Sequence, residues 1–227
     1  MVSESQLAIK AVVLLIPFIL IVLRLVVVLP SVKLRKSIGN DNFIAPNVHG
    51  STIMIMLGSG GHTGEMIRLL SKVKLENFNR IWVSSSGDSS SLIKAKEYEE
   101  NLKTNQLSSI YLTLYRARKV GESIPSSIIS TIKSFISTFN SLIQLKELPS
   151  LVLLNGPGTC VPLAYILFIL KFFGLAKTKI VYIESLARVN KLSLSGKLLL
   201  PISDRFIVQW EKLALKYERA EFYGILV

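Results

Sequence analysis

The stretch MLGSGGHTGEMIRLL, residues 56–70, joins an apolar segment to a helix-like one through four glycines, and it decides the fold. Ser51–Leu57 predict a β-strand, and Glu65–Leu70 predict the start of a helix. GSGGHTG is therefore a strand-to-helix turn, which in an open α/β sheet lies at the carboxyl end of a strand, where ligands bind. Its glycines let backbone N–H groups approach an anion, the helix N-terminus adds positive charge, and Thr63 can cap the helix. The turn is physically a phosphate cradle, with a tight turn that holds no ligand as the simpler alternative.

The turn departs from the known nucleotide-binding motifs. It begins like the dinucleotide fingerprint G-x-G-x-x-G, but Thr63 stands where the third glycine belongs. Asp88 lies within a serine-rich loop and makes a poor ribose-binding carboxylate. Gly196–Lys197 is followed by leucine, so no P-loop motif is present. These departures disfavour dinucleotide binding and nucleoside triphosphate hydrolysis.

Short apolar segments alternate with longer helical stretches through the rest of the chain. The apolar segments lack polar alternation, as expected of parallel strands that are covered on both faces. The predicted strands are Ser51–Leu57, Ile81–Ser84, Ile110–Tyr115, Leu151–Leu154, Ile180–Ile183 and Phe206–Val208. This alternation predicts one Rossmann-like, doubly wound parallel α/β sheet.

The clearest predicted helix is Ser126–Leu148, because its apolar residues recur at helical spacing along one face. That face consists of Ile128, Ile132, Phe135, Ile136, Phe139, Leu142 and Ile143. A second apolar stretch, residues 161–175, contains Lys171 and is too short for a confident membrane span. We expect it to be a buried helix of the sheet, with a helix dipping into a membrane surface as the alternative and a second span as the least favoured interpretation.

Composition points to a membrane-associated protein. Half of the 227 residues are hydrophobic, the mean hydropathy is +0.47, and residues 7–29 form an apolar run of bilayer length. The run exceeds a signal-peptide core and no A-x-A-like cleavage site follows it, so a retained anchor is favoured. Basic residues after the run place the remainder in the cytosol, and the single cysteine, Cys160, excludes a disulfide framework. The predicted organisation is a short tail 1–6, an anchor 7–29, a linker 30–50 and one α/β domain 51–227.

The formal net charge of +12 indicates affinity for anionic lipid or an anionic substrate. Nucleic acid is the usual alternative, but the chain has no basic helix, zinc pattern or aromatic RNA-binding motif. We therefore expect no nucleic-acid partner. The sequence also offers no metal-ligand spacing and no cofactor motif, so neither a metal nor a cofactor is predicted.

A second glycine-rich turn, NGPGT at residues 155–159, follows Leu151–Leu154 directly. Two such turns in one sheet can face each other across a crevice, and together they suggest a pyrophosphate ligand. The predicted pyrophosphate-binding residues are Gly58, Ser59, Gly60, Gly61, Thr63, Asn155, Gly156, Gly158 and Thr159.

His62 lies within the first turn and is the candidate catalytic residue. It can donate to phosphate oxygens, act as a general base or bond its own turn, and the phosphate contact is slightly favoured. The segment YIESLAR, 182–188, places further polar residues at the end of a strand. Glu184, Ser185 and Arg188 are the candidates for contacts to an acceptor's sugar or phosphate, although Glu184 and Arg188 can instead pair with each other.

Five ordered motifs now resemble a known family. They are GSGGHTGE at 58–65, NGPGT at 155–159, YIESLARV at 182–189, LSGKL at 194–198 and FIVQW at 206–210. The chain resembles the membrane-anchoring subunits of the eukaryotic two-subunit UDP-N-acetylglucosamine transferase of dolichol-linked oligosaccharide synthesis. The resemblance covers nearly all of the predicted α/β domain; Glu218 departs from it, where related chains carry proline.

The resemblance implies the amino-terminal, acceptor-binding half of a GT-B glycosyltransferase. A separate cytosolic subunit would bind UDP-N-acetylglucosamine, so this chain is expected to be inactive alone. The implied heterodimer adds the second N-acetylglucosamine to dolichol-pyrophosphate-N-acetylglucosamine in N-glycan precursor synthesis. The implied location is the endoplasmic reticulum membrane, and also the nuclear envelope, with a lumenal N-terminus and a cytosolic C-terminal domain. Neighbouring enzymes of the pathway would be further partners.

The chain ends on an apolar tail, which we expect to pack against another surface because free apolar termini otherwise fray. The predicted partner-binding residues are Phe222, Tyr223, Ile225, Leu226 and Val227. Completion of the chain's own sheet is the alternative, and the resemblance favours docking. A pure membrane recruiter that makes no contribution to the active site is the competing hypothesis for the function as a whole.

Overall fold

The computed structural model describes residues 4–32, 50–102, 107–118 and 121–227, so most of the predicted linker 30–50 lies outside the described residues. These residues form a seven-stranded sheet in the order β3-β2-β1-β4-β5-β6-β7. Every neighbouring pair of strands is parallel. The strands are β1 Thr52–Met56, β2 Asn79–Ser85, β3 Ser109–Leu114, β4 Leu151–Asn155, β5 Lys179–Ile183, β6 Arg205–Val208 and β7 Ala220–Phe222.

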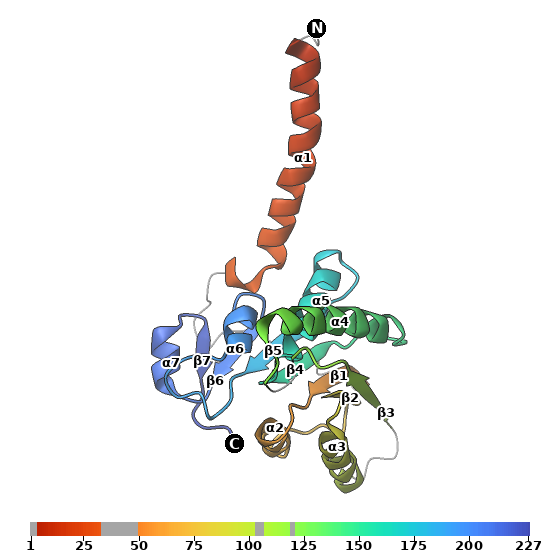
Figure 1. Ribbon diagram of the computed structural model, residues 1–227, viewed down its shortest axis with the longest axis vertical. Coiled ribbons are helices and arrows are strands. Elements are labelled where there is room, and N and C mark those ends of the chain that lie inside the picture. The colour runs from red at the N-terminus through yellow and green to blue at the C-terminus, as the bar shows by residue number, and fades with distance from the viewer. Residues whose placement is uncertain (1–3, 33–49, 103–106, 119–120) are drawn as a thin grey trace.

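Helices cover both faces of the sheet (Figure 1), and the predicted Rossmann-like architecture is confirmed. The helices of the body are α2 Gly61–Leu70, α3 Ser89–Asn101, α4 Ile124–Ile143, α5 Cys160–Phe172, α6 Leu194–Leu199 and α7 Glu211–Lys216. Two hydrophobic clusters lie on opposite faces, one beneath α4, α5 and α6 and the other beneath α2 and α3. All six predicted strands are present, and β7 is an addition from the start of the C-terminal tail.

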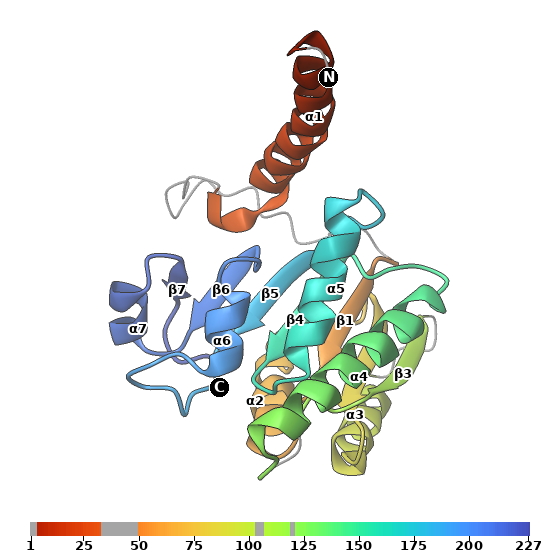
Figure 2. The same ribbon diagram turned by 45° about the horizontal axis from the view of Figure 1, so that its top comes forward.

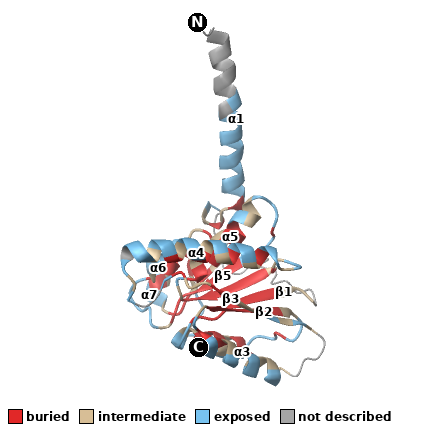
Figure 3. Cartoon of the chain, turned by 45° about the vertical axis from the view of Figure 1, so that its right-hand side comes forward, coloured by how far each residue is buried: buried red, intermediate tan, exposed pale blue. Residues whose placement is uncertain are grey.

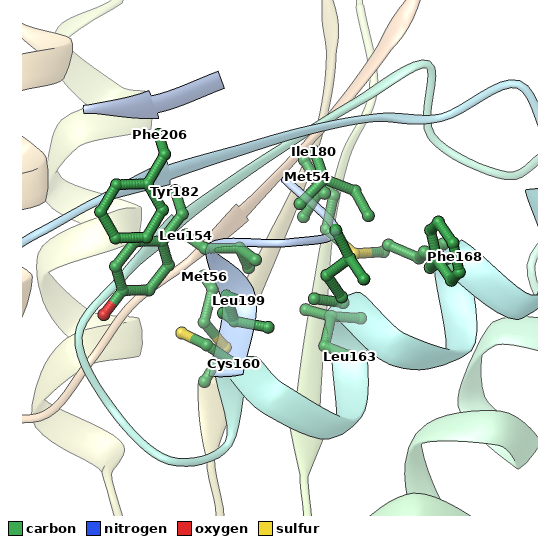
Figure 4. Close-up of a cluster of buried hydrophobic side chains, with 14 of the residues drawn as sticks. Met54, Met56, Leu154, Cys160, Leu163, Phe168, Ile180, Tyr182, Leu199 and Phe206 are labelled. Carbon is green, nitrogen blue, oxygen red and sulfur yellow. The ribbon is translucent and has the colours of Figure 1, made fainter. Parts of the chain in front are cut away.

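Helix α5 is buried against the sheet, as expected for the apolar stretch 161–175. Leu163, Ala164 and Leu167 have no exposed surface, and Figure 4 shows Leu163 among the core side chains of the strands. Only the C-terminal end is open to solvent, at Ile169 and at Phe173 just beyond the helix. This packing agrees with the expected buried helix of the sheet; contact of its open end with a membrane surface stays a prediction.

The long N-terminal helix α1, Glu4–Val28, covers most of the predicted anchor 7–29. Its side chains are described only at residue 13 and from residue 15 onward. Among the residues that the structure describes, we find no helix of sufficient length and apolarity to cross a membrane, so the predicted anchor is not confirmed.

The inner end of α1 is fixed to the body. Val28 joins the main core, with 5% of its surface exposed. Arg24 donates from Nε to the carbonyl of Phe172 at 2.7 Å and from Nη2 to that of Lys171 at 3.1 Å. These carbonyls belong to the last turn of α5, where the helix leaves acceptors unpaired, so Arg24 caps that end. A short 3-10 turn, Pro30–Val32, follows α1.

Candidate functional site

The predicted site residues gather at the carboxyl ends of β1, β4 and β5, which are adjacent in the sheet. Figure 2 shows these strands side by side, with α2 starting directly after β1 and α5 directly after β4. The helix α2 begins at Gly61, earlier than predicted, so His62 and Thr63 belong to its first turn rather than to a loop.

The two glycine turns touch each other around His62. A side chain at Gly58 would place its Cβ 2.6 Å from Pro157 Cδ and 2.7 Å from His62 Cβ. Gly156 has a φ of +85°, and a Cβ there would overlap the His62 ring. Both positions therefore require glycine, because the backbone of one turn lies directly against the side chain of the other.

Hydrogen bonds assign the tautomer of His62. Its Nδ1 lies 2.8 Å from Asn155 Oδ1. The other atom of that amide, Asn155 Nδ2, donates to Glu65 Oε2 at 3.1 Å, which fixes which way the amide points. Because Oδ1 can only accept, His62 Nδ1 must carry a proton. In the neutral ring, Nε2 then carries no proton and can only accept a hydrogen bond. A contact to a phosphate oxygen would instead need an N–H donor at Nε2.

Glu65 completes this chain of side chains. Its other oxygen, Oε1, accepts from Ser185 Oγ at 2.8 Å, and the residue is 8% exposed. The four residues Ser185, Glu65, Asn155 and His62 thus connect the ends of β5, α2 and β4. We call this set the histidine relay.

Glu184 is turned into the body rather than toward a ligand. It has no exposed surface, and its oxygens accept from the backbone N–H of Ser193 at 2.9 Å and of Ser185 at 3.1 Å. Gly196 lies so close that any side chain there would overlap Glu184 Oε2. Glu184 therefore anchors the segment 185–193, and we withdraw the predicted ligand contact. Burial and the Glu184 charge raise the pKa of the neighbouring Tyr182 hydroxyl.

The two predicted threonines also serve the scaffold. Thr63, 1% exposed, donates to the carbonyl of Gly58 and lies 2.6 Å from Ser91 Oγ, so it does not cap α2. Thr159, 1% exposed, accepts from Ser85 Oγ at 3.0 Å. The actual N-cap of α2 is Gly60, which provides no side-chain hydrogen bond. The first backbone N–H groups of α2 are therefore left for an external anion.

The predicted residues divide into an exposed and a buried group. Ser59, Gly60, Gly61, Gly158 and Arg188 are exposed, and His62 is half-buried. Gly58, Gly156 and Asn155 are buried and shape the turns. Glu65 was missed because a glutamate in the first turns of a helix usually faces solvent; its position three residues after His62, one helical turn on, was the available signal.

A parallel sheet with two interlocked glycine turns and a histidine at one edge defines a Rossmann-like α/β domain, the class in which ligands bind at that edge. The chain belongs to the family described as "Oligosaccharide biosynthesis protein Alg14 like", whose model matches residues 53–226.

Curated relatives match over most of their length. The protein named UDP-N-acetylglucosamine transferase subunit ALG14 in Debaryomyces hansenii is 60% identical over 230 residues, covering 99% of each chain. The human protein of the same name is 39% identical over 181 residues, covering 78% of this chain and 83% of its own. Among solved structures, Acinetobacter baumannii MurG matches with a TM-score of 0.48 and 13% identity, over 77% of this chain and 45% of the other.

Proposed function

We propose that this chain is the acceptor-binding, membrane-anchoring subunit of a UDP-N-acetylglucosamine transferase. It adds the second N-acetylglucosamine to dolichol-pyrophosphate-N-acetylglucosamine on the cytosolic face of the endoplasmic reticulum. A separate cytosolic subunit binds the donor sugar nucleotide. Family membership and the names of the relatives support the transferase role. The step, the partner and the location rest on the resemblance of the motifs.

The interlocking of the two glycine turns around His62 carries the proposal. Each turn follows a central strand, and the two meet closely enough that Gly58 and Gly156 cannot hold a side chain. The uncapped start of α2 offers backbone N–H groups to one phosphate of a pyrophosphate. The exposed glycine of the second turn, Gly158, lets the other phosphate approach the backbone. A ligand held there places its sugar near His62.

His62 then serves as the general base in this proposal. Asn155 holds the proton on Nδ1, so Nε2 accepts the proton of the acceptor hydroxyl as that oxygen attacks C1 of the donor sugar, and UDP leaves with the electron pair of the broken C1–oxygen bond. Glu65 orients the Asn155 amide and stabilises the ring once it becomes a cation. This assignment replaces the phosphate contact that the sequence slightly favours, because a neutral ring with this tautomer has no donor at Nε2.

The test is reconstitution with a candidate donor-binding subunit. The full chain and the partner are co-purified and assayed with a short-chain pyrophosphate-linked N-acetylglucosamine acceptor and UDP-N-acetylglucosamine. We expect product only when both chains are present. Robust turnover by this chain alone would contradict the division of labour.

The same assay separates an acceptor-binding subunit from a pure membrane recruiter. His62→Ala should lower kcat by about 100-fold or more while partner recovery stays unchanged, since a general base commonly contributes that much. Arg68→Ala is the matched control, because Arg68 is an exposed residue of the same helix. If His62→Ala keeps full turnover, the recruiter hypothesis is the correct one.

A further inference from the structure

Helix α4 is reversed relative to the usual amphipathic helix of a water-soluble domain. Its inward stripe carries small hydroxyl residues, Ser130, Ser134 and Thr138, with exposures of 7%, 0% and 0%. The outward stripe carries large apolar residues that are each about half exposed. These are Ile128 at 58%, Ile129 at 58%, Ile132 at 54%, Ile136 at 57%, Phe139 at 46% and Ile143 at 59%. We call these six residues the α4 outer face.

Two of the three inward hydroxyls, those of Ser130 and Ser134, are hydrogen-bonded to the body, while the buried Thr138 hydroxyl has no partner among the described residues, so α4 is not simply rotated out of place. Ser134 Oγ donates to the carbonyl of Tyr115 at 2.7 Å, and Ser130 Oγ donates to Glu122 at 2.6 Å. Leu142, one turn beyond Thr138, is buried in the main core. Rotating the helix to hide the isoleucines would break these hydrogen bonds and expose Leu142. The apolar side is therefore fixed outward (Figure 3).

We propose that the α4 outer face lies on a lipid bilayer. Its chemistry fits lipid better than a protein partner, because protein interfaces are enriched in aromatic residues, methionine and arginine, and five of the six residues of this face are isoleucine. Lys133 lies along the same side of the helix, three residues before Ile136, and the chain carries a formal net charge of +12. Positive charge beside an apolar stripe matches the anionic headgroups and acyl chains of a membrane surface.

The neighbouring elements also expose apolar side chains. α4 packs on α5, and α5 packs on the inner end of α1. Exposed apolar residues recur on both, at Phe173 and Leu175 just beyond α5 and at Phe18 on α1. α4 runs crosswise to α1 in Figures 1 and 3, two views related by a turn about the long axis. This is the arrangement expected if α4 lies flat on the bilayer and α1 is the membrane anchor of the proposed function.

This inference goes beyond the proposed function, because it names a second membrane contact that no transferase activity requires, and it rests on the proposed function for the anchoring of α1. Its test uses the full chain in vesicles of phosphatidylcholine with phosphatidylserine, without partner, donor or acceptor. An environment-sensitive fluorophore is attached at Ile132→Cys. The native Cys160 has no exposed surface and burial raises the pKa of its thiol, so labelling is confined to the new cysteine.

Ile93→Cys is the matched control. Ile93 is 55% exposed, close to the exposure of Ile132, but it lies on α3, which covers the opposite face of the sheet. Both labelled chains are brought to the vesicle in the same way through α1. Nitroxide lipids that carry the quencher in the acyl chain then report which side of the domain touches the bilayer.

We expect the Ile132→Cys probe to show blue-shifted emission and to lose most of its intensity to acyl-chain nitroxides, while the Ile93→Cys probe changes little. A label at Ile128→Cys should behave like that at Ile132→Cys. This second position shows that the result does not arise from a local structural change in one variant. Equal, weak quenching at all three positions would overturn the proposal. Shielding of Ile132 that requires an added donor subunit and is insensitive to the quenching lipids would also overturn it, because the occupant would then be a protein.

Discussion

At the scale of single residues, the histidine relay sets the chemistry of the site. Asn155 is the pivot, because its amide accepts from His62 on one side and donates to Glu65 on the other. Replacing the Glu65 carboxylate by an amide turns one of its two acceptor atoms into a donor, so the side chain can face Asn155 with either atom and no longer fixes this direction. The Nδ1-protonated tautomer of His62 is then no longer the favoured one.

Glu65→Gln is therefore expected to lower kcat more than it changes KM in the reconstituted transferase. We expect a loss of about tenfold, the worth of one hydrogen bond to a charged group. Nitrogen-15 NMR of the His62 ring should show the Nδ1-protonated tautomer in the parent chain and a mixture in the variant. Ser185→Ala, which leaves the Glu65–Asn155 bond in place, should keep the parent tautomer. An unchanged ring spectrum in Glu65→Gln would refute the positioning role.

Gly156 provides a second test at this scale, since a side chain there meets both an unfavourable φ of +85° and the His62 ring. Gly156→Ala should reduce the free energy of unfolding by about 1–3 kcal/mol. Gly158→Ala is the control, because its Cβ would meet nothing within 4 Å. Urea denaturation followed by circular dichroism measures both. Equal stability of the two variants would show that the turns are less tightly interlocked than the geometry indicates.

The sequence predicted where the site lies better than what each residue does there. Strand ends followed by glycines located the two turns and His62, because backbone conformation leaves a clear mark on composition. The roles of Glu184, Thr63 and Thr159 were misassigned, since a polar residue at a strand end can face a ligand or hold its own loop. Only the three-dimensional contacts distinguish these cases.

At the scale of elements, hydrophobic patterns predicted where the strands lie but not which face of each helix packs on the sheet. The six predicted strands are present because buried parallel strands are continuously apolar. The three-residue strand β7 carries too few residues to give such a pattern. For α4 the period was correct, yet five of the seven predicted face residues point outward. Periodicity shows that a helix has an apolar face, but it does not show whether that face packs on the protein core or points outward.

The link between β2 and α3 could not be predicted from the sequence. Arg80, 1% exposed, donates to Glu99 from Nε at 2.6 Å and from Nη2 at 2.9 Å, and it also donates to the carbonyl of Phe78. Trp82 Nε1 donates to the same carboxylate at 2.6 Å. Arginine and glutamate are common surface residues, so nothing in their spacing marks a buried pair.

Glu99→Ala should destabilise the fold by about 3–5 kcal/mol, because it leaves the Arg80 guanidinium buried without its counter-ion. The matched control is Glu97→Ala, an exposed position on the same helix, which should change stability by less than about 0.5 kcal/mol. Thermal or urea unfolding measures the difference. Similar stability of the two variants would mean that solvent reaches Arg80 readily.

At the scale of the whole molecule, part of the C-terminal tail packs against the chain's own body, and only the remainder is exposed to a partner. Phe222 belongs to β7, which pairs with β6. Beyond it, Leu226 N donates to Gln209 Oε1 at 3.3 Å, and Lys72 Nζ donates to the Leu226 carbonyl at 2.9 Å. The side chains of Tyr223 and Ile225 are about half exposed, at 48% and 55%. Partner docking through this tail stays a prediction.

Deletion of residues 225–227 separates the two roles of the tail. We expect recovery of the donor-binding subunit to fall sharply while the unfolding temperature of this chain changes little, because β7 is retained. Co-purification and thermal unfolding give the two measurements. The control is Lys72→Ala, which removes only the internal contact to Leu226. Undiminished partner recovery after the deletion would defeat the docking prediction.

The histidine relay also has a consequence for how such sites change over evolutionary time. His62 and Ser185 donate at the two ends, Asn155 accepts and donates, and Glu65 accepts from both sides, so the direction of every bond depends on the next residue. A single substitution reverses or breaks this series of hydrogen bonds. A substitution at one relay position is therefore tolerated only together with a compensating substitution at another. Across relatives, positions 62, 65, 155 and 185 should therefore vary together as a set, even though they are far apart in the chain.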